Sequence, residues 1–449
     1  MKRFFCISIA VFLLCSSMTG QDVPKQWTLE ECIRYAIANN ISLKQWEQNE
    51  ELKKIDLNTS KNSWLPNLNV NGNQSLGFGR SQSREGTIVD RNSASTSMSI
   101  QTSMPLFDGF RIPNNIAAGK LDLKAATEAL NKAKEDLAIG VASYYLQVLY
   151  CKEVHKIAEL QVNLTKEQVA NTEAMVEVGK VALSQLYDIK AQLATDEVTL
   201  TETNNNLRLA MLDLIQALEL ERLGDDFDIV QPDIDDAIAD NMQSILLPDF
   251  IYDNAMLFKP QIKEQEYLLE KQKKLLRVAK SYYYPQLNLS ASYSNGYYQY
   301  FGNDGIVNIP FNDQFKQNAQ RGIGVSLSLP IFNRFSYRNG VRRAKLSIVN
   351  QTLTMENTKK TLYKEIQQAY FSATAEQEKY IASEKSVAAS KEALMYAEER
   401  YMAGKSTVVE YNESKTKYAT SLSQQARAKY NFIFKSKILD FYNGVPITL

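Results

Sequence analysis

The amino-acid sequence predicts a mixed α and membrane-β fold, in which the strands of an outer-membrane barrel are continued by long α-helices. Two observations predict this fold. Four segments alternate apolar with small polar residues, which is typical of a strand with one face in lipid and the other in a wide, wet lumen. Another stretch runs from Pro113 to Gly179 without a proline. A helix of that length is on the order of 95 Å long, about three times the diameter of a small domain.

The N-terminus has the features of a secretory signal peptide over residues 1–20. Two basic residues precede an apolar run from Phe4 to Leu14, and small and polar residues follow as far as Gly20. The run is too short to span a membrane as a helix, and we expect cleavage near Gly20. Cys15 leaves a lipoprotein alternative open, although Leu14 is larger than the residue that lipoprotein processing usually accepts before the cysteine.

Composition argues against several classes of protein. Lys plus Arg equals Asp plus Glu, at 51 each, so no net charge would recruit nucleic acid. With His155 as the single histidine, a histidine-built metal site or a catalytic triad is not expected. We find no phosphate-binding glycine loop and no nucleophile elbow, so we expect neither an enzyme nor a cofactor. An oxidising compartment would permit a disulfide between Cys32 and Cys151, but we interpret both as isolated small apolar residues.

The mature chain is predicted to open with two helices. Thr28 has a glutamate three residues later, at Glu31, which is the spacing of a capping box. A helical stripe of apolar residues follows as far as Asn39 and Asn40, where we expect the helix to break. A second helix is predicted over residues 42–63, before Pro66.

The four alternating segments are predicted to be membrane strands. In the last one, Ile323, Val325 and Leu327 alternate with glycine and serine, whereas the outer face of a soluble sheet would carry charged residues or threonine. A soluble edge strand remains the alternative for any one segment alone. Each segment has a proline at one end, where strand pairing must stop, and aromatic residues lie beside these prolines as in an interfacial girdle. The segments are residues 67–78, 93–104, 286–297 and 320–329.

The long helix is predicted to fold back on a second helix. A turn is expected at Gly179–Lys180, and both helices carry the apolar spacing of a coiled-coil seam. In the second helix the leucines fall one heptad apart, which predicts a coiled-coil hairpin. These leucines are Leu186, Leu193, Leu200, Leu207 and Leu214.

This order of elements then occurs a second time. Residues 285–289 reproduce 66–70, and the turn at 403–405 reproduces the turn at 178–180. We therefore expect two structural repeats, each made of helices, two strands and a helical hairpin. The expected boundaries are 21–225 for the first repeat, 226–246 for a connector and 247–449 for the second repeat.

The repeat bears on how a barrel could close. Four strands per chain are too few, because the smallest membrane barrels have about eight, and an open sheet edge is not tolerated in lipid. Two, three or four chains would supply about 8, 12 or 16 strands, and the larger numbers leave an open channel. The helices must continue the same cylinder outside the membrane.

With these features together, the chain resembles the TolC family of outer-membrane efflux and secretion ducts across nearly its whole mature length. Besides the repeat, the opening at residues 27–31 and the proline-flanked strands match, and residues 178–184 and 400–410 resemble the two hairpin tips of that family. The resemblance implies a homotrimer with a twelve-stranded barrel in outer-membrane lipid and an α-helical tunnel in the periplasm of a Gram-negative cell. It also implies docking to a periplasmic adaptor protein and an inner-membrane pump.

The resemblance carries the residues of the periplasmic aperture over unevenly. Glu410 and Glu413 match the two acidic rings of the family, and Tyr401 matches the tyrosine of its closing network. Gln185 and Ser406 stand where that network has an aspartate and an arginine, so the charged lock of the family is missing two charges. The alternative is that the two glutamates are solvated carboxylates near a helix N-terminus, where the dipole favours them, and that Tyr401 packs in a core.

The two turns are predicted to end the coiled coils farthest from the membrane. Small and aliphatic residues there would form an exposed apolar tip, which suggests a docking surface for the adaptor. The expected docking residues are Gly179, Lys180, Ala182, Leu183 and Ser184 in the first hairpin, with Ala403, Gly404, Lys405 and Val408 in the second.

The favoured function is therefore the passive exit duct of a tripartite efflux pump for small molecules. A duct for a type I protein secretion system has the same fold and is the first alternative. A structural coiled-coil surface protein is the second, but the strands and the repeat argue against it. Without an ATP site, the chain would need a partner to power transport. The sequence does not identify the transported substrate.

Overall fold

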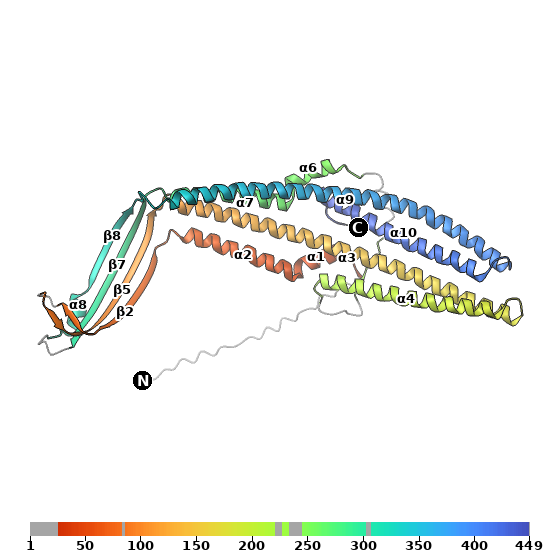
Figure 1. Cartoon of the computed structure of the whole chain (residues 1–449), viewed down its shortest axis with the longest axis horizontal. Coiled ribbons are helices and arrows are strands. Elements are labelled where there is room, and N and C mark those ends of the chain that lie inside the picture. Colours follow the sequence, from red (N-terminus) through yellow and green to blue (C-terminus); the bar gives the residue numbers. More distant parts are fainter. Residues whose placement is uncertain (1–25, 83–85, 221–226, 233–244, 302–306, 449) are drawn as a thin grey trace, which may run out of the picture.

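The computed structural model describes residues 26–82, 86–220, 227–232, 245–301 and 307–448. The expected signal peptide, Cys15 and the cleavage site near Gly20 lie outside this part of the chain, as does most of the expected connector. The described chain is elongated, with a curved sheet at one end and two helical hairpins whose turns lie at the other end (Figure 1).

The same series of helix lengths occurs in both halves of the chain: 11, 22, 67 and 35 residues. The order of elements thus repeats, while the boundaries assigned to the two repeats stay a prediction. The helices of the first half are α1 (Leu29–Asn39), α2 (Ile41–Asn62), α3 (Arg111–Glu177) and α4 (Leu183–Ala217). Those of the second half are α6 (Pro248–Phe258), α7 (Pro260–Ser281), α9 (Ser336–Met402) and α10 (Val408–Tyr442).

The capping box predicted at the start of α1 is present. The Thr28 hydroxyl accepts from the backbone N–H of Glu31 at 3.3 Å, and the Glu31 carboxylate accepts from the Thr28 N–H at 2.9 Å. Asn40 both ends α1 and caps α2, because its side-chain oxygen accepts from the Leu43 N–H at 3.1 Å. One residue thus caps the end of α1 and the start of α2, which fixes the break between the two helices that the sequence predicted.

The four predicted strands form one antiparallel sheet in the order β2–β5–β7–β8. On one face a row of polar residues crosses the sheet through Asn71, Ser99, Ser294 and Gln320. The neighbouring row on the other face runs through Val70, Ile100 and Tyr293 and ends at Arg321, near the start of β8. The two-faced character predicted from the alternation is therefore present in the register. The strands are β2 (Asn67–Gly77), β5 (Asn92–Phe107), β7 (Gln286–Phe301) and β8 (Gln320–Ser328).

Two strands are longer than predicted. Strand β5 continues past Pro105 to Phe107, with a register irregularity at that point, so this proline marks a bulge and not the strand end. Strand β7 continues to Phe301. Between β2 and β5 lies a short hairpin, formed by β3 (Arg80–Gln82) and β4 (Ile88–Asp90).

A short helix, α8 (Phe311–Gln317), covers the part of β7 that extends beyond β8. The Gln314 side-chain amide accepts from the N–H of Tyr298 and donates to its carbonyl, at 2.9 and 2.7 Å. Asn308 does the same for Tyr300, at 2.8 and 2.7 Å. Side-chain amides thus replace a paired strand along this edge and satisfy backbone groups that would otherwise be open.

The apolar core lies midway along the helices. Two short strands, β1 (Gln26–Trp27) and β6 (Asp228–Ile229), pair in parallel beside it. The buried Tyr145 hydroxyl donates to the Val230 carbonyl at 2.6 Å and so holds this pair on α3. Cys32 and Cys151 belong to the same core as free, buried thiols, as the sequence analysis expected. Among the described helices, none is long and apolar enough to cross a membrane.

The long helices run side by side from the sheet to the turns. α3 packs against α4, α9 packs against α10, and α3 also contacts α7 and α10 (Figure 1). In the predicted leucine seam of α4, Leu186 and Leu214 are buried and the other three leucines are half-buried. Both hairpins therefore contact one another along α3 and α10, and this contact positions the site at their ends.

Candidate functional site at the hairpin tips

The two tip turns have the same backbone structure. Gly179 and Gly404 both have φ of 70°, a left-handed conformation that favours glycine. The Lys180 N–H donates to the Met175 carbonyl at 2.8 Å, and the Lys405 N–H donates to the Arg400 carbonyl at 2.8 Å. This is the six-to-one bond of a Schellman motif, which ends α3 and α9 and turns the chain back.

The tips expose most, but not all, of the apolar residues predicted there. Ala182, Leu183 and Ala403 are exposed, with 54% of Leu183 accessible to solvent. Val408 is only 2% exposed, so the expectation that it belongs to the exposed tip is wrong. As the first residue of α10 it packs into the hairpin core, and Val409 is exposed beside it.

The two candidate ring carboxylates differ in their surroundings. Glu410 lies in the first turn of α10, where its N–H donates to the Thr407 hydroxyl at 3.2 Å. Its carboxylate is 3.4 Å from the Arg400 guanidinium, in a pair exposed to solvent. Glu413 is exposed and lines a groove of about 720 Å³ between α4 and α10, together with Asp188. Glu410 therefore has a cationic neighbour that the sequence analysis did not foresee.

Tyr401 connects three helices at the tip. Its ring stacks on Tyr411 of α10, with centroids 5.4 Å apart and planes 14° apart, and its hydroxyl is 3.4 Å from the Thr172 hydroxyl of α3. Burial raises the pKa of Tyr411 to about 12. Among the described residues, no hydrogen bond joins Tyr401 to Gln185 or Ser406.

Within the described residues of the single chain, Tyr401, Gln185 and Ser406 therefore do not form one hydrogen-bonded network. The backbone N–H of Gln185 donates to the Ala182 carbonyl at 3.0 Å at the start of α4. The Ser406 hydroxyl is buried, and no group in the described part of the chain forms a hydrogen bond with it.

A buried charged cluster lies deeper in the hairpins. Lys415 of α10 is 1% exposed, Asp196 of α4 is 7% exposed and Thr165 of α3 is fully buried. The Lys415 ammonium donates to the Thr165 hydroxyl at 2.6 Å and lies 3.7 Å from the Asp196 carboxylate, which the same hydroxyl contacts. Gln192 also donates to Asp196, at 2.8 Å. Three helices from both hairpins thus meet at one ion pair, which we call the hairpin joint (Thr165, Asp196 and Lys415).

Burial decides the electrostatics of the hairpin joint. Desolvation lowers the pKa of Lys415, and the nearby Asp196 charge partly opposes that shift. Neighbouring buried polar groups add to the cost of the cluster, because the Gln168 amide and the Asn412 side-chain oxygen have no hydrogen-bond partner among the described residues. Such a joint specifies how the hairpins fit more than it adds net stability.

The sequence analysis missed the hairpin joint because each member alone has the composition of a solvated helix face. One signal was present: Thr165, Gln168 and Thr172 continue the three-and-four spacing of the α3 seam with polar residues. A polar residue at a seam position requires a buried partner, and Asp196 and Lys415 supply charges for it.

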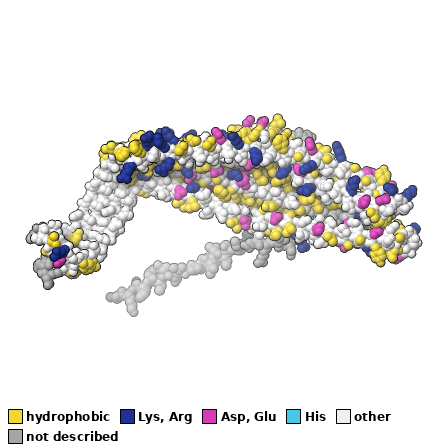
Figure 2. All heavy atoms as spheres, viewed as in Figure 1, with side chains coloured by type: hydrophobic (Ala, Val, Ile, Leu, Met, Phe, Trp, Pro, Cys, Tyr) yellow, Lys and Arg dark blue, Asp and Glu magenta, His cyan; other side chains and the backbone are white. Residues whose placement is uncertain are grey.

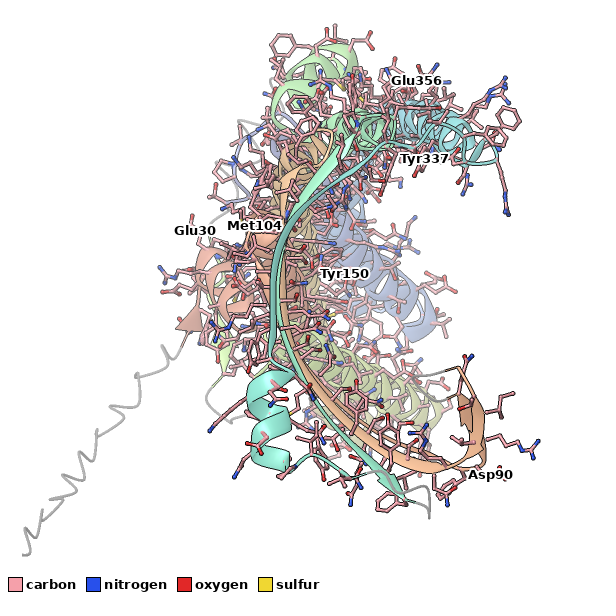
Figure 3. All side chains as sticks on the ribbon, turned by 90° about the vertical axis from the view of Figure 1, so that its left-hand side faces the viewer. Glu30, Asp90, Met104, Tyr150, Tyr337 and Glu356 are labelled. Carbon is pink, nitrogen blue, oxygen red and sulfur yellow. The ribbon has the colours of Figure 1, made fainter. Side chains whose placement is uncertain are left out.

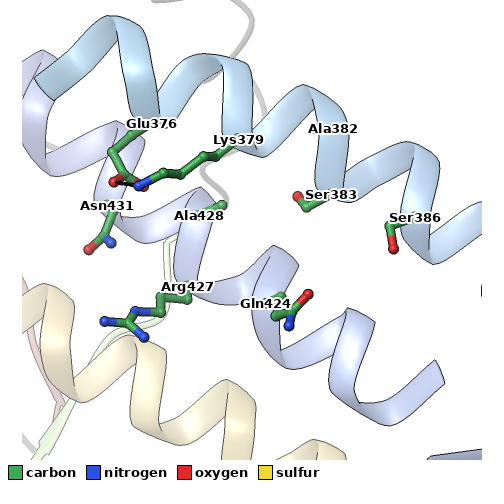
Figure 4. A pocket seen from close by; sticks show the side chains of 9 residues that line it. All are labelled: Glu376, Lys379, Ala382, Ser383, Ser386, Gln424, Arg427, Ala428 and Asn431. Atoms are coloured by element: carbon green, nitrogen blue, oxygen red, sulfur yellow. Dashed lines mark hydrogen bonds and ion pairs between the residues drawn. The ribbon is translucent and has the colours of Figure 1, made fainter. Parts of the chain in front are cut away.

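A second groove, of about 580 Å³, lies between α9 and α10 above the tips. Figure 4 shows Glu376 and Lys379 close together on α9, where their charged atoms are 2.7 Å apart, with Gln424 and Arg427 on α10. The lining of this groove is polar, and two of its charged residues pair with each other. We therefore interpret the groove as the surface between two packed helices. Within the described residues, no group of three or more histidine, cysteine or acidic side chains is placed to hold a metal ion.

The fold is that of outer-membrane channels, as comparison with solved structures shows. The structure of CusC matches with a TM-score of 0.76 and 17% identity, covering 93% of this chain and 92% of that chain. The outer membrane channel CmeC of Campylobacter jejuni matches with a TM-score of 0.74 and 19% identity, covering 93% and 86%. A curved four-stranded sheet continued by two long hairpins is thus a known channel architecture.

The family model for outer membrane efflux proteins matches residues 32–219 and 251–441. Outer membrane protein TolC of Escherichia coli is 22% identical over 442 residues, which cover 96% of this chain and 84% of that protein. Outer membrane efflux protein BepC of Brucella suis is 21% identical over 392 residues, covering 87% and 78%. The chain therefore belongs to the outer membrane efflux protein family, of which the TolC proteins are members. It is an outer-membrane efflux channel whose helices lie in the periplasm.

Proposed function

We propose that this chain works as the homotrimeric outer-membrane duct of a tripartite pump. Its hairpin tips would meet a periplasmic adaptor and an inner-membrane pump, and the export of small molecules would be passive within the duct itself. The observation that carries the proposal is the exposed apolar tip of two matching hairpins, at the end of the chain farthest from the membrane sheet.

The free edges of the chain support closure into a ring. Strands β2 and β8 are the two outer strands of the sheet, and among the described residues each pairs on one side only. The helices connected to these two strands, α2 and α9, also expose apolar side chains. These are Leu52 and Ile55 on α2, and Leu346, Val349 and Leu353 on α9. A head-to-tail contact of these unlike edges would close a ring, and three copies would supply twelve strands.

The first prediction concerns this ring. Detergent-purified protein should have the mass of three chains and resist separation on mild SDS gels. Leu353→Glu places a charge in the proposed contact and should lower the trimer fraction at least tenfold, because an unpaired buried charge costs several kcal/mol. Leu257→Glu, on the exposed side of α6, is the matched control and should leave the trimer intact. A monodisperse monomer in lipid would contradict the ring.

The names of the relatives support efflux over protein secretion. BepC is called an efflux protein, and the family itself carries that name. A duct for a type I secretion system is the alternative within the same fold. Cross-linking through Ala182→Cys and Ala403→Cys in native membranes, followed by identification of the captured adaptor and its transporter, would separate the two. An exporter dedicated to one protein substrate would favour the alternative.

The second prediction concerns the aperture. In a trimer, Glu410 and Glu413 would each supply three carboxylates around one opening, and such rings concentrate cations. Arg400 neutralises part of the Glu410 field, so Glu413 should dominate. We expect Glu413→Gln to reduce cation selectivity in planar bilayers severalfold and Glu410→Gln to reduce it less.

Arg400→Gln provides the matched control for the aperture, because it frees Glu410 from its cationic neighbour and should raise cation selectivity. If the double variant Glu410→Gln, Glu413→Gln keeps the cation selectivity of the wild type, the two side chains are solvated helix-end charges. The ring hypothesis would then be wrong.

A further inference from the structure

Basic residues gather where the helices of the second repeat meet the membrane sheet. Figure 2 shows Lys and Arg side chains concentrated at this junction. Residues 271–301 and 307–355 contain twelve Lys and Arg and one acidic residue, Asp313. Ten of the twelve lie within 271–280 and 334–345, and the other two are Lys316 and Arg321.

 Asp313 belongs to α8 at the opposite end of the sheet. The two segments at the junction, residues 271–280 and 334–345, therefore contain no acidic residue.

On α7 the charge changes sign along one exposed stripe. The exposed residues of α7 are spaced by four and three residues, so they lie on one face of the helix. Away from the sheet the stripe is acidic, at Glu266 and Glu270. Toward the sheet it is basic, at Lys273, Arg277 and Lys280. Lys273 pairs with Glu270 at 2.6 Å, and within the described chain neither Arg277 nor Lys280 forms an ion pair.

On helix α9 the basic residues nearest the sheet come before the first acidic residue, Glu356. Arg338, Lys345, Glu356 and Tyr363 are 7, 11 and 7 residues apart, which is two, three and two helical turns, so they share one face. Tyr363 donates to Asp249 of α6 at 2.9 Å, which identifies this face as the one covered by α6. Figure 3 shows the helical layer end-on, with α6 on its convex side and Glu356 on the same side of α9.

The stripe of α7 lies on that convex side as well. A groove of about 350 Å³ between α7 and α9 is lined by Ala279, Ser336 and Arg343. Ser336 is two positions from Arg338, and Arg343 is two positions from Lys345. The groove therefore lies on the face of α9 opposite to Arg338 and Lys345. Ala279 is likewise turned away from Arg277 on α7. The convex side of the junction therefore carries four basic residues, Arg277, Lys280, Arg338 and Lys345, which we call the basic collar.

The position of the basic collar matches a membrane surface. Exposed aromatic rings at Tyr283, Tyr284 and Phe335 lie between it and the strands, where an interfacial girdle belongs. The Arg338 guanidinium is 5.7 Å from the Phe335 ring centroid. Lys345 is about 14 Å along α9 from its first residue. The collar thus spans the polar layer next to the acyl chains and the first Debye length beyond it.

We propose that the basic collar binds the phosphate groups of anionic phospholipids in the periplasmic leaflet of the outer membrane. Long Lys and Arg side chains can extend along the apolar surface and place their charges among lipid headgroups. Each such residue near an anionic surface strengthens the attraction by roughly fivefold. The collar would hold the duct at a fixed depth and enrich anionic lipid around it, a role that depends on the membrane position of the sheet and on neither the adaptor nor the pump.

The test compares purified trimers in vesicles of phosphatidylethanolamine mixed with phosphatidylglycerol. The lipids retained by the protein after detergent extraction would be counted by mass spectrometry. Wild-type protein should enrich phosphatidylglycerol roughly tenfold at low salt, and the enrichment should fall toward one as salt is raised. Changing all four collar residues to Gln should remove most of the enrichment.

The matched control changes four exposed basic residues far from the junction to Gln: Arg208, Lys360, Lys385 and Lys391. It should retain the wild-type lipid enrichment. Equal enrichment in the collar variant and the wild type would overturn the proposal, and so would equal losses in the collar and control variants. Dissociation of the collar variant into single chains would place these residues between copies of the chain and would overturn it too. Lipid retention needs no pump, so this result is independent of the proposed partners.

Discussion

Replacing Lys415 with Met is expected to destabilise the hairpin joint by about 3–5 kcal/mol, because the change leaves Asp196 buried without its counter-charge. The loss should be local to the tips. Hydrogen exchange of the amides of α3, α4 and α10 around the joint would measure it as a lower free energy of opening. The amides of the core around Tyr145 should stay protected, since they lie in a separate apolar cluster.

A double variant separates the charge from the packing. Lys415→Met with Asp196→Leu replaces the ion pair by apolar groups, and we expect it to recover most of the stability lost in Lys415→Met. Lys360→Met, at an exposed position of α9, is the control and should change little. If Lys415→Met and the double variant open with the same free energy, Asp196 is not left uncompensated, and the account of the joint is wrong.

The joint should also respond to alkaline pH. Because burial lowers the pKa of Lys415, the folded chain loses this proton at a lower pH than the unfolded chain does. The unfolded state then binds more protons, so this residue adds stability as pH rises toward 10.5, the ordinary value for lysine. Protease resistance of the tips in urea should therefore rise with pH in the wild type relative to Lys415→Met.

Efflux should be abolished by the pair of substitutions Ala182→Arg and Ala403→Arg, with trimers still present in the outer membrane. Both alanines are exposed beside the two tip turns. An arginine that becomes buried without a partner in a docked interface costs about 3 kcal/mol or more, which is at least a 100-fold loss of affinity. Accumulation of a fluorescent efflux substrate in cells would report the loss, and mild SDS gels would report the trimer.

Ala194→Arg with Ala388→Arg is the matched control, because both positions are exposed in the helices away from the turns. The control should export normally. Unchanged efflux in the tip variant would remove Ala182 and Ala403 from the docking surface, whereas equal losses in the tip and control variants would point to a general effect of added charge.

The sequence predicted those parts of the fold that depend on the periodicity of apolar residues and on contacts between residues close in the chain. The capping box at Thr28 and the glycine turns at Gly179 and Gly404 are fixed by contacts within a few residues, so their spacing alone identifies them. The strands were found because one face must suit lipid, which forces a period of two on the sequence. The TolC-family resemblance rested on the order of these elements and is confirmed.

What the sequence did not predict depends on contacts across long separations. The side-chain amides of Gln314 in α8 and of Asn308, which precedes α8, form hydrogen bonds with the backbone of β7, and no periodic signal in the sequence marks them. Val408 was placed at the tip by its closeness to the turn, but the orientation of the first turn of α10 buries it. The hairpin joint links residues 31 and 250 positions apart, so no local pattern could pair them.

The polar face of the sheet has an electrical consequence for the assembled duct. In the paired strands, the residues that share a face with Ser99 and Ser294 are serine, asparagine, glutamine, glycine, tyrosine and one proline, none of them charged at neutral pH. Once three sheets close into a tube, this wall would act as an unbiased resistor in series with the charged orifice at the hairpin tips. The current–voltage asymmetry of a single channel should then originate at its periplasmic end, and Glu413 should contribute more to it than Glu410, which is paired with Arg400.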